Sequence, residues 1–121
     1  MFDETKIKKE MDEISARFPE ERKRLKEATE KIGKREAKAQ LAITFMQPEL
    51  LYDPRAKEYV QKAKDGGVKL TEADKKAIIA LELEADQIAL DLAKFDCETS
   101  KQQFEKLQPQ LSFLQSEMKL G

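Results

Sequence analysis

The chain of 121 residues contains no histidine and no tryptophan, and it has only one cysteine. Without imidazole, neither a Ser-His-Asp nor a Cys-His catalytic set can form, and a zinc site of the HExxH type is excluded. Cys97 stands alone, so an internal disulfide or a cysteine zinc cluster is impossible. Because Asp96 and Glu98 beside it would raise the pKa of a thiol, we expect Cys97 to fill a core rather than to attack substrates. We expect a protein with no catalytic residue, no metal and no cofactor, and therefore not an enzyme.

Long apolar runs are also missing. No window approaches the roughly 18 apolar residues that a membrane-spanning helix needs. The amino-terminal letters MFDETK lack a basic region followed by an apolar run, so we expect no targeting leader. These features predict a cytosolic protein that does not interact with a membrane.

Charged residues and helix formers dominate what remains. The 23 Lys and Arg residues nearly balance the 24 Asp and Glu residues, and only four glycines and four prolines interrupt the chain. Such a composition is typical of long helices rather than of sheets. We predict an all-α protein with a single helical domain over residues 1–121, built as an elongated antiparallel helical hairpin or coiled coil with a short helix in the connector. The predicted helices cover about residues 5–18, 20–47, 54–64, 71–107 and 109–119. Pro19 is expected to end or bend its helix, and the closing helix is expected to kink or restart at Pro109.

The connector carries clear boundary signals. Asp53, directly before a proline, is a suitable N-cap for the short helix, and the pair Gly66-Gly67 can end that helix in a left-handed turn. Thr71 and Asp74 are spaced as a variant of the capping box. The long closing helix should therefore begin at about Thr71.

An apolar pattern with gaps of three and four residues runs through the closing helix and predicts a coiled-coil seam. The rhythm is interrupted between Phe95 and Phe104, which suggests a stutter or a polar layer. The predicted seam, either of an oligomer or of the core, consists of Ile78, Leu81, Ile88, Leu92, Phe95, Phe104, Leu111 and Leu114.

Charge is distributed unevenly, and this distribution suggests a register. Eight basic and three acidic residues lie between positions 22 and 38, whereas eight acidic and three basic residues lie between positions 72 and 98. An antiparallel hairpin with its turn near residue 61 would bring Phe18 to Phe104 and would form three cross-helix ion pairs. The predicted pairs are Lys38 with Glu84, Lys31 with Asp91, and Arg24 with Glu98.

Apolar residues remain beyond what two helices can bury, so we expect a homo-oligomer. Whether the deduced pairing acts within one chain or between subunits stays open at this point. The acidic residues of the closing helix, among them Glu82 and Asp86, are expected to form an exposed face rather than a metal site.

The basic stretch over residues 22–38 can be interpreted in two ways. It could contact phosphates through electrostatics that do not depend on sequence, with Phe45, Tyr52 and Tyr59 offering faces for stacking bases. It could equally be a solvated helix face that balances the acidic helix.

Two segments and the closing helix resemble the small phage recombination mediator proteins of the UvsY type. The resemblance rests on GKREAKAQL at residues 33–41, GVKLTEA at residues 67–73, and LSFL at residues 111–114 in the long closing helix. It implies an oligomeric helical protein, encoded by a bacteriophage and acting in the bacterial cytoplasm. Such a protein binds single-stranded DNA and helps a recombinase replace the single-strand-binding protein during DNA recombination. With Lys31 from the basic stretch, the expected nucleic-acid-binding residues are Lys31, Lys34, Arg35, Lys38, Arg55 and Lys57.

The alternative is a protein that binds only protein partners, such as a coiled-coil adaptor, a scaffold or a viral inhibitor. Binding to single-stranded DNA that weakens steeply as salt rises would distinguish the two hypotheses.

Overall fold

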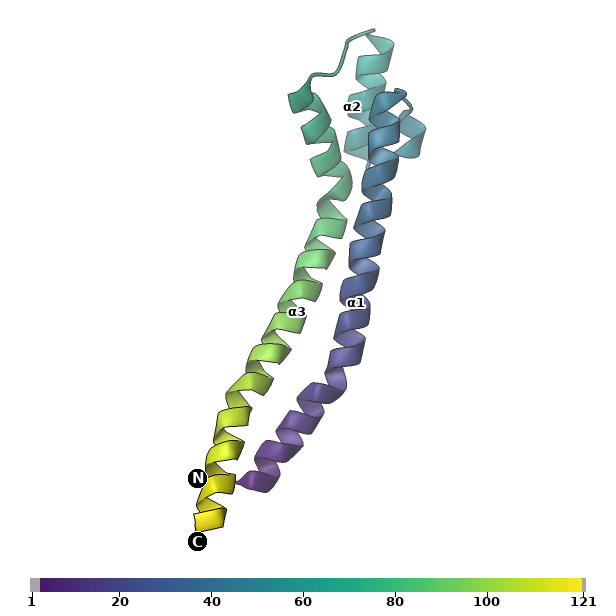
Figure 1. Ribbon diagram of the computed structural model, residues 1–121. Helices are drawn as coiled ribbons and strands as arrows, with labels where there is room; N and C mark the ends of the chain where they lie inside the picture. The colour runs from purple at the N-terminus through teal and green to yellow at the C-terminus, as the bar shows by residue number, and fades with distance from the viewer. Residues whose placement is uncertain (1–2, 121) are drawn as a thin grey trace. The chain divides into compact units, whose positions relative to one another are not determined.

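The computed structural model describes residues 3–120, and the side chains of residues 119 and 120 are not described. Met1 and Phe2, part of the segment in which no leader was expected, lie outside this range. The described chain contains four helical elements and no strand. Figure 1 shows the ribbon with α1, α2 and α3 labelled. The prediction of an all-α helical hairpin with a short connector helix is confirmed. The elements are α1 (Glu4–Thr44), the 3-10 helix η1 (Pro48–Leu50), α2 (Pro54–Asp65) and α3 (Glu72–Leu120).

Neither proline ends its helix, so the predicted helix boundaries at Pro19 and Pro109 are wrong. Helix α1 continues through Pro19 and helix α3 continues through Pro109, so each replaces two predicted helices. Both prolines lie on exposed positions of their helices. Water can therefore hydrogen-bond the carbonyl group that loses its backbone partner, and the rest of each long helix maintains the conformation. None of the described helices is both long enough and apolar enough to cross a membrane.

The predicted signals at the ends of the connector are confirmed. The carboxylate of Asp53 accepts hydrogen bonds from the first backbone N–H groups of α2. Thr71 and Asp74 form a reciprocal capping box, in which each backbone N–H donates to the other side chain at 2.9 and 3.1 Å. Gly67 has a φ of 61°, the left-handed conformation that the glycine pair predicted.

Helix α1 ends three residues earlier than predicted, and it does so without a glycine. Met46 adopts a φ of 52°, and the N–H of Gln47 donates to the carbonyl oxygen of Ala42 at 2.9 Å. This is the hydrogen bond of a left-handed helix end, here formed by a residue whose side chain disfavours that conformation. The sequence offered no sign of it.

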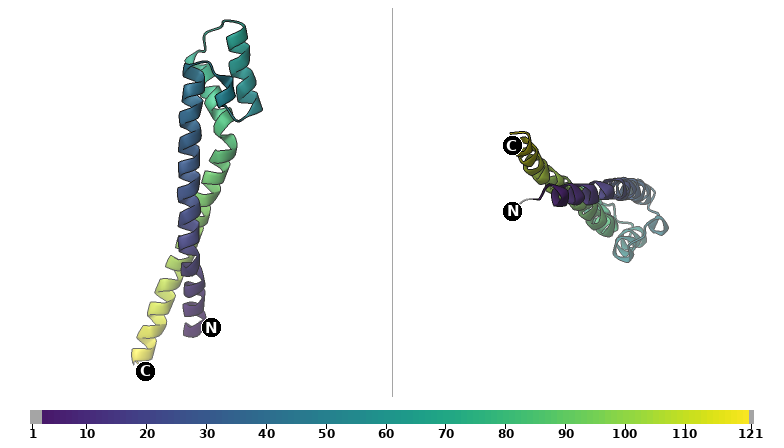
Figure 2. Two further views of the ribbon diagram at one scale, coloured as in Figure 1. Left: turned by 90° about the vertical axis from the view of Figure 1, so that its right-hand side faces the viewer. Right: turned by 90° about the horizontal axis from the view of Figure 1, so that it is seen from below.

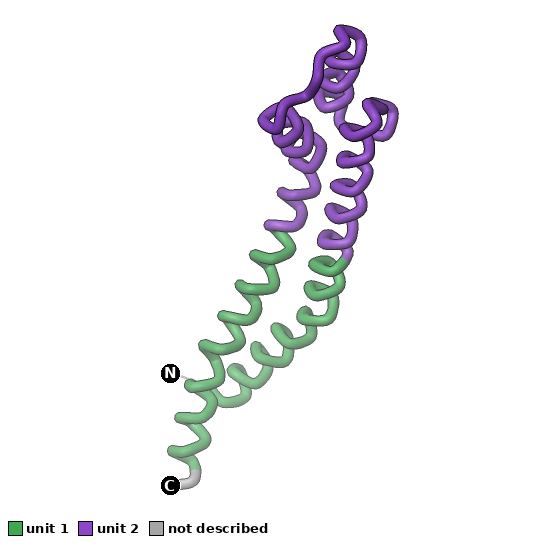
Figure 3. Tube along the Cα trace, turned by 45° about the horizontal axis from the view of Figure 1, so that its top comes forward, with its two compact units in different colours: residues 1–26, 92–121 green, residues 27–91 purple. Residues whose placement is uncertain are grey.

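Packing divides the chain into two compact units, coloured separately in Figure 3. Unit 2 comprises residues 27–91. Within it, η1 and α2 lie against the adjoining parts of α1 and α3, as Figures 1 and 2 show. Val60 of α2 and Ile78 of α3 are completely buried between these elements. The remaining core residues of unit 2 include Ala39, Ala42, Ile43, Leu51, Ala56, Ala63 and Leu70.

Unit 1 comprises residues 1–26 and 92–121, and its described part is an antiparallel pair of helices. The rings of Phe18 and Phe104 meet edge to face with centroids 5.6 Å apart, which confirms that predicted contact. One turn away, the hydroxyl of Ser100 donates to the buried carboxylate of Glu21 at 2.7 Å. An exposed hydrogen bond from Arg17 to Gln103 at 3.4 Å also joins the two helices of unit 1.

Within one chain, the centre of the predicted seam is not part of the core. Ile78 is buried, and Leu81, Phe104, Leu111 and Leu114 are half-buried, but Ile88, Leu92 and Phe95 are 57, 58 and 65 % exposed. The apolar pattern predicted a stripe next to the truly buried face of α3. The prediction failed because that face also contains inward-facing carboxylates and small residues. The buried positions of α3 in this region are Glu82, Asp86, Leu90, Ala93 and Ser100.

The predicted ion-pair register is also wrong. Lys31 contacts Asp86 rather than Asp91, at 3.7 Å. Glu84 pairs with Arg55 instead of Lys38. Arg24 pairs with Glu20 on its own helix, and Glu98 accepts a hydrogen bond from Gln102. Exposed ion pairs contribute little free energy, so the charged side chains pair with nearby partners and do not determine how α1 and α3 are aligned.

Candidate nucleic-acid interface

Four of the six residues predicted to bind nucleic acid line one open groove within unit 2. We call this groove the basic groove. Lys31, Lys34, Arg35 and Lys38 come from α1, where spacings of three and four residues place them on the same side of the helix. The opposite wall is formed by the connector residues Glu49, Leu50, Leu51 and Tyr52.

Tyr52 is the aromatic residue of the basic groove. The guanidinium carbon of Arg35 lies 4.2 Å from the centre of the Tyr52 ring, which is a cation–π contact. Tyr52 is nevertheless 71 % exposed, so part of its surface remains open to a ligand. Of the three aromatic residues predicted to stack bases, only Tyr52 lines this groove. Tyr59 lines a different groove and donates its hydroxyl to Asp74, and the exposed Phe45 lines neither of the two.

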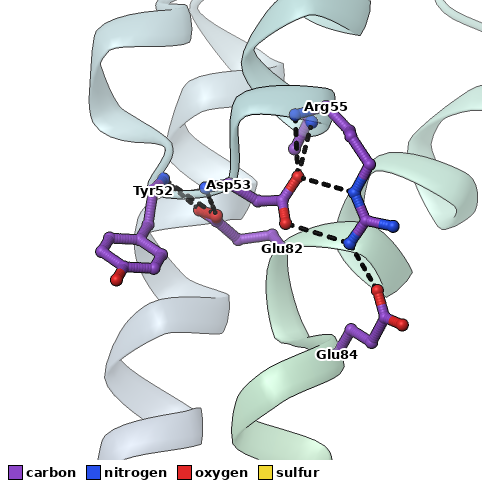
Figure 4. A network of polar contacts seen from close by, with 6 residues as sticks. Tyr52, Asp53, Arg55, Glu82 and Glu84 are labelled. Carbon is purple, nitrogen blue, oxygen red and sulfur yellow. Dashed lines mark hydrogen bonds and ion pairs between the residues drawn. The ribbon is translucent and has the colours of Figure 1, made fainter.

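The backbone of Tyr52 is held by a glutamate from α3, as Figure 4 shows. The N–H of Tyr52 donates to both carboxylate oxygens of Glu82 at 2.8 Å, and the N–H of Asp53 donates to Oε1 at 2.6 Å. Glu82 is only 3 % exposed, so its assignment to an exposed acidic face was wrong. The missed signal was its spacing, because Glu82 follows the buried Ile78 by one helical turn. Burial is tolerated because backbone donors satisfy the carboxylate.

Asp86 is the second carboxylate that sequence reasoning wrongly placed at the surface. It is 5 % exposed and lies 2.8 Å from Nε of Arg35 and 3.7 Å from Nζ of Lys31. Its oxygen Oδ2 has no aligned hydrogen bond within the described chain, so the contact with Arg35 acts through charge alone. Arg35 is thereby fixed over the Tyr52 ring, and part of its positive charge is neutralised.

Lys34 and Lys38 supply the uncompensated charge of the basic groove. Both are exposed, and neither forms an ion pair with any other described residue. The carboxylate of Glu49 on the opposite wall would repel a bound anion. It is one negative charge against four cationic side chains in the same groove. The groove is therefore suited to an anion that passes along α1.

The other two predicted contacts, Arg55 and Lys57, lie outside the basic groove. The guanidinium of Arg55 is held by Asp53 at 3.1 Å and by Glu84 (Figure 4). Its hydrogen bonds to Asp53 and then to Glu84 raise the pKa of Arg55, and the same contact lowers the pKa of the Asp53 carboxyl. Lys57 lines a separate recess beside Glu49 and Glu58. Arg55 is therefore engaged by Asp53, the N-cap residue of α2, and by Glu84.

Cys97 lies half-buried in unit 1, away from the groove residues in sequence. Burial is the main cause that raises the pKa of its thiol, followed by the negative charges of Glu21 and Asp96. Asp96 was anticipated as a cause and Glu21 was not. Among the described residues, no group of Cys, Asp and Glu side chains is arranged to hold a metal ion.

Comparison of the chain with protein-family models, with curated proteins and with solved structures finds no match. The resemblance to phage recombination mediators therefore stays a prediction. The feature of the structure that indicates a function is the basic groove, which has cationic side chains beside an accessible aromatic ring.

Proposed function

We propose that this chain is a non-catalytic single-stranded-DNA-binding accessory protein of phage-type homologous recombination, which assists recombinase loading in the bacterial cytoplasm. The observation that carries the DNA-binding part is the meeting of four basic side chains with the exposed ring of Tyr52 in one groove. Groups of these two kinds bind single strands without reading their sequence.

In the proposed complex, the two chemical parts of a nucleotide have separate partners. Backbone phosphates lie along α1 against Lys31, Lys34 and Lys38. The charges of Lys34 and Lys38 are not neutralised within the described chain. A base stacks on the open part of the Tyr52 ring, which contributes about 1 to 3 kcal/mol per base in proteins of this kind. Because duplex DNA hides its base faces, stacking of this kind favours single strands.

The recombination part of the proposal rests on the resemblance of residues 33–41, 67–73 and 111–114 to the UvsY-type mediators. It adds a recombinase or a single-strand-binding protein as the expected protein partner. This part can fail while DNA binding holds, because the basic groove argues only for the nucleic acid.

The first test measures the anisotropy of a labelled single-stranded oligonucleotide over a series of salt concentrations. We expect Lys31→Ala/Lys34→Ala/Lys38→Ala to weaken binding at least about tenfold and to reduce the salt slope by about 2, because each lost phosphate contact on a single strand contributes about 0.7. This variant retains Arg35, so Asp86 keeps its closest partner.

The matched control is Lys64→Ala/Lys69→Ala/Lys76→Ala, which removes the same charge from exposed lysines outside the basic groove. Its affinity should stay within about twofold of the parent protein. Equal losses in the two variants would mean that net charge, rather than the groove, drives binding.

Tyr52→Leu separates stacking from charge. It should weaken binding to single strands about fivefold or more while leaving the salt slope unchanged, since no phosphate contact is lost. Absence of binding by the parent protein at low salt would contradict the proposal. That result would favour the protein-only adaptor, for which the exposed Ile88, Leu92 and Phe95 are the specific observation.

A further inference from the structure

The two faces of the Tyr52 ring have different surroundings. The guanidinium carbon of Arg35 lies 4.2 Å from the ring centre, so it covers one face. Tyr52 is nevertheless 71 % exposed, which indicates that the opposite face is open to solvent. Among the described residues that line the basic groove, Tyr52 is the only aromatic one. The groove therefore offers one open aromatic face, which is enough for one base.

Arg35 is itself held in place by a carboxylate of α3. Its Nε lies 2.8 Å from Oδ2 of Asp86, and its side chain is only 20 % exposed, whereas the side chain of Lys31 is 65 % exposed. Asp86 is buried, and its other cationic neighbour, Lys31, lies farther away at 3.7 Å. Because a buried carboxylate is unfavourable without a close partner, Asp86 keeps the guanidinium over the ring.

A backbone phosphate would gain little by binding to Arg35. The negative charge of Asp86 offsets the charge of the guanidinium and would repel a phosphate that approached it. Lys34 and Lys38 line the same groove, are exposed, and form no ion pair with any other described residue. These two lysines are therefore the better phosphate contacts, and Arg35 is available for a different role.

We infer that Arg35 is a positioning residue rather than a phosphate contact: Asp86 holds its guanidinium against one face of the Tyr52 ring, and the opposite face stacks a single base. Carboxylate, guanidinium, ring and base would then follow one another in that order. A buried residue of α3 would thereby act on the bound strand without touching it. Because a stacked base presupposes that single strands bind, this role of Arg35 rests on the proposed function.

The experiment compares Arg35→Gln with the matched control Lys34→Gln, which removes the same charge from the neighbouring position of α1. The readout is the anisotropy of a labelled oligothymidylate over a series of salt concentrations. Lys34→Gln should reduce the salt slope by about 0.7, the contribution of one phosphate contact on a single strand. Arg35→Gln should weaken binding about threefold or more and leave the salt slope within about 0.2 of the parent value, because only stacking is impaired.

Combining each variant with Tyr52→Leu tests whether Arg35 acts through the ring. The losses at Lys34 and Tyr52 should multiply, since phosphate and base contacts are independent. Once Tyr52 is replaced, Arg35→Gln should change the affinity by less than about twofold, because the ring that Arg35 supports is gone. A fall of about 0.7 in the salt slope of Arg35→Gln, or a loss that multiplies with that of Tyr52→Leu, would overturn the positioning role.

Arg35→Lys repeats the test in a variant that keeps a positive charge beside Asp86, so the buried carboxylate retains a partner. Lysine lacks the planar group that lies flat on an aromatic ring. We expect about a threefold loss of affinity with an unchanged salt slope. Affinity equal to that of the parent would overturn the positioning role, because any charge at this position would then suffice. Absence of binding by the parent protein at low salt would overturn the proposed function itself, whereas a failed comparison at Arg35 would leave that function intact.

Discussion

Unit 2 and unit 1 are built from the same two long helices, yet they bury their side chains to different degrees. In unit 2, the connector adds η1 and α2, and Val60 and Ile78 lose all contact with solvent. In the described part of unit 1, Ile7 and Ile14 retain some exposure although they are its most buried isoleucines. Two helices alone leave the flanks of their contact open, so a third element is needed to complete a core.

Buried carboxylates show the same contrast. Glu82 in unit 2 accepts hydrogen bonds from two backbone N–H groups. Glu21 in unit 1 receives one hydrogen bond from Ser100, and its Oε2 has no partner within the described chain. Backbone donors thus satisfy Glu82, whereas Glu21 and the unit 2 residue Asp86 each keep one buried oxygen without a hydrogen bond in the described chain.

The largest expected effect compares the two cores directly. Ile78→Ala should lower the free energy of unfolding by about 2 to 5 kcal/mol, since it leaves a cavity that surrounding elements cannot fill. Ile14→Ala should cost less, near the lower end of that range, because water and neighbouring side chains can occupy the space in unit 1. Chemical denaturation followed by circular dichroism measures both. Equal losses would show that the two units are packed equally well.

A smaller effect compares the polar contacts. Glu82→Gln keeps the side-chain volume but replaces one acceptor with a donor that faces backbone donors, so we expect a loss of about 1 to 3 kcal/mol. Ser100→Ala removes the donor to Glu21 and should cost about 1 kcal/mol. The same denaturation measurement compares them. A larger loss for Ser100→Ala would contradict the view that unit 2 depends more on its buried carboxylate.

The smallest effect is the response of two capping carboxylates of unit 2 to acid. The hydrogen bond from Arg55 is the main cause that lowers the pKa of Asp53, and the hydroxyl of Tyr59 is the main cause that lowers the pKa of Asp74. A lowered pKa in the folded state stabilises the protein above the ordinary carboxyl value of about 3.9, and this contribution is lost as pH falls through the folded-state pKa.

Asp53→Asn tests this acid response because asparagine can still cap a helix but does not titrate. Its melting temperature should lie below that of the parent protein at pH 7, and the gap should close in acid. A gap that does not narrow as pH falls below the ordinary carboxyl value of about 3.9 would contradict the assignment, because the stabilisation from a lowered pKa begins to be lost there.

Helix class and helix ends could be predicted from the sequence because they depend on local interactions. Asp53 and the pair Thr71 and Asp74 act on backbone groups within one turn, and these were predicted correctly. The proline breaks failed because tolerance of a proline depends on exposure, which requires the fold. Phe18 and Phe104 were paired correctly since both are large and meet on the same side of the hairpin.

The buried face of α3 and the walls of the basic groove could not be predicted from the sequence in full. Glu82 and Asp86 face inward only because the connector backbone and Arg35 present donors and charge to them. A prediction from hydrophobic periodicity assigns charged residues to the solvent-exposed face. The predicted seam therefore included Ile88 and Leu92 instead of the buried face. The cluster of lysines on α1 was visible in the sequence, whereas the partnership of Arg35 with Tyr52 required the folded connector.

The attachment of residues 52 and 53 to Glu82 has a consequence for how this surface could be redesigned. Because main-chain N–H groups make the contact, the position of the loop does not depend on the identity of the side chain at residue 52. The side chain of residue 52 can therefore be exchanged while its backbone stays anchored to Glu82. Exchanging its ring for another would alter what the surface recognises while the surrounding scaffold stays in place.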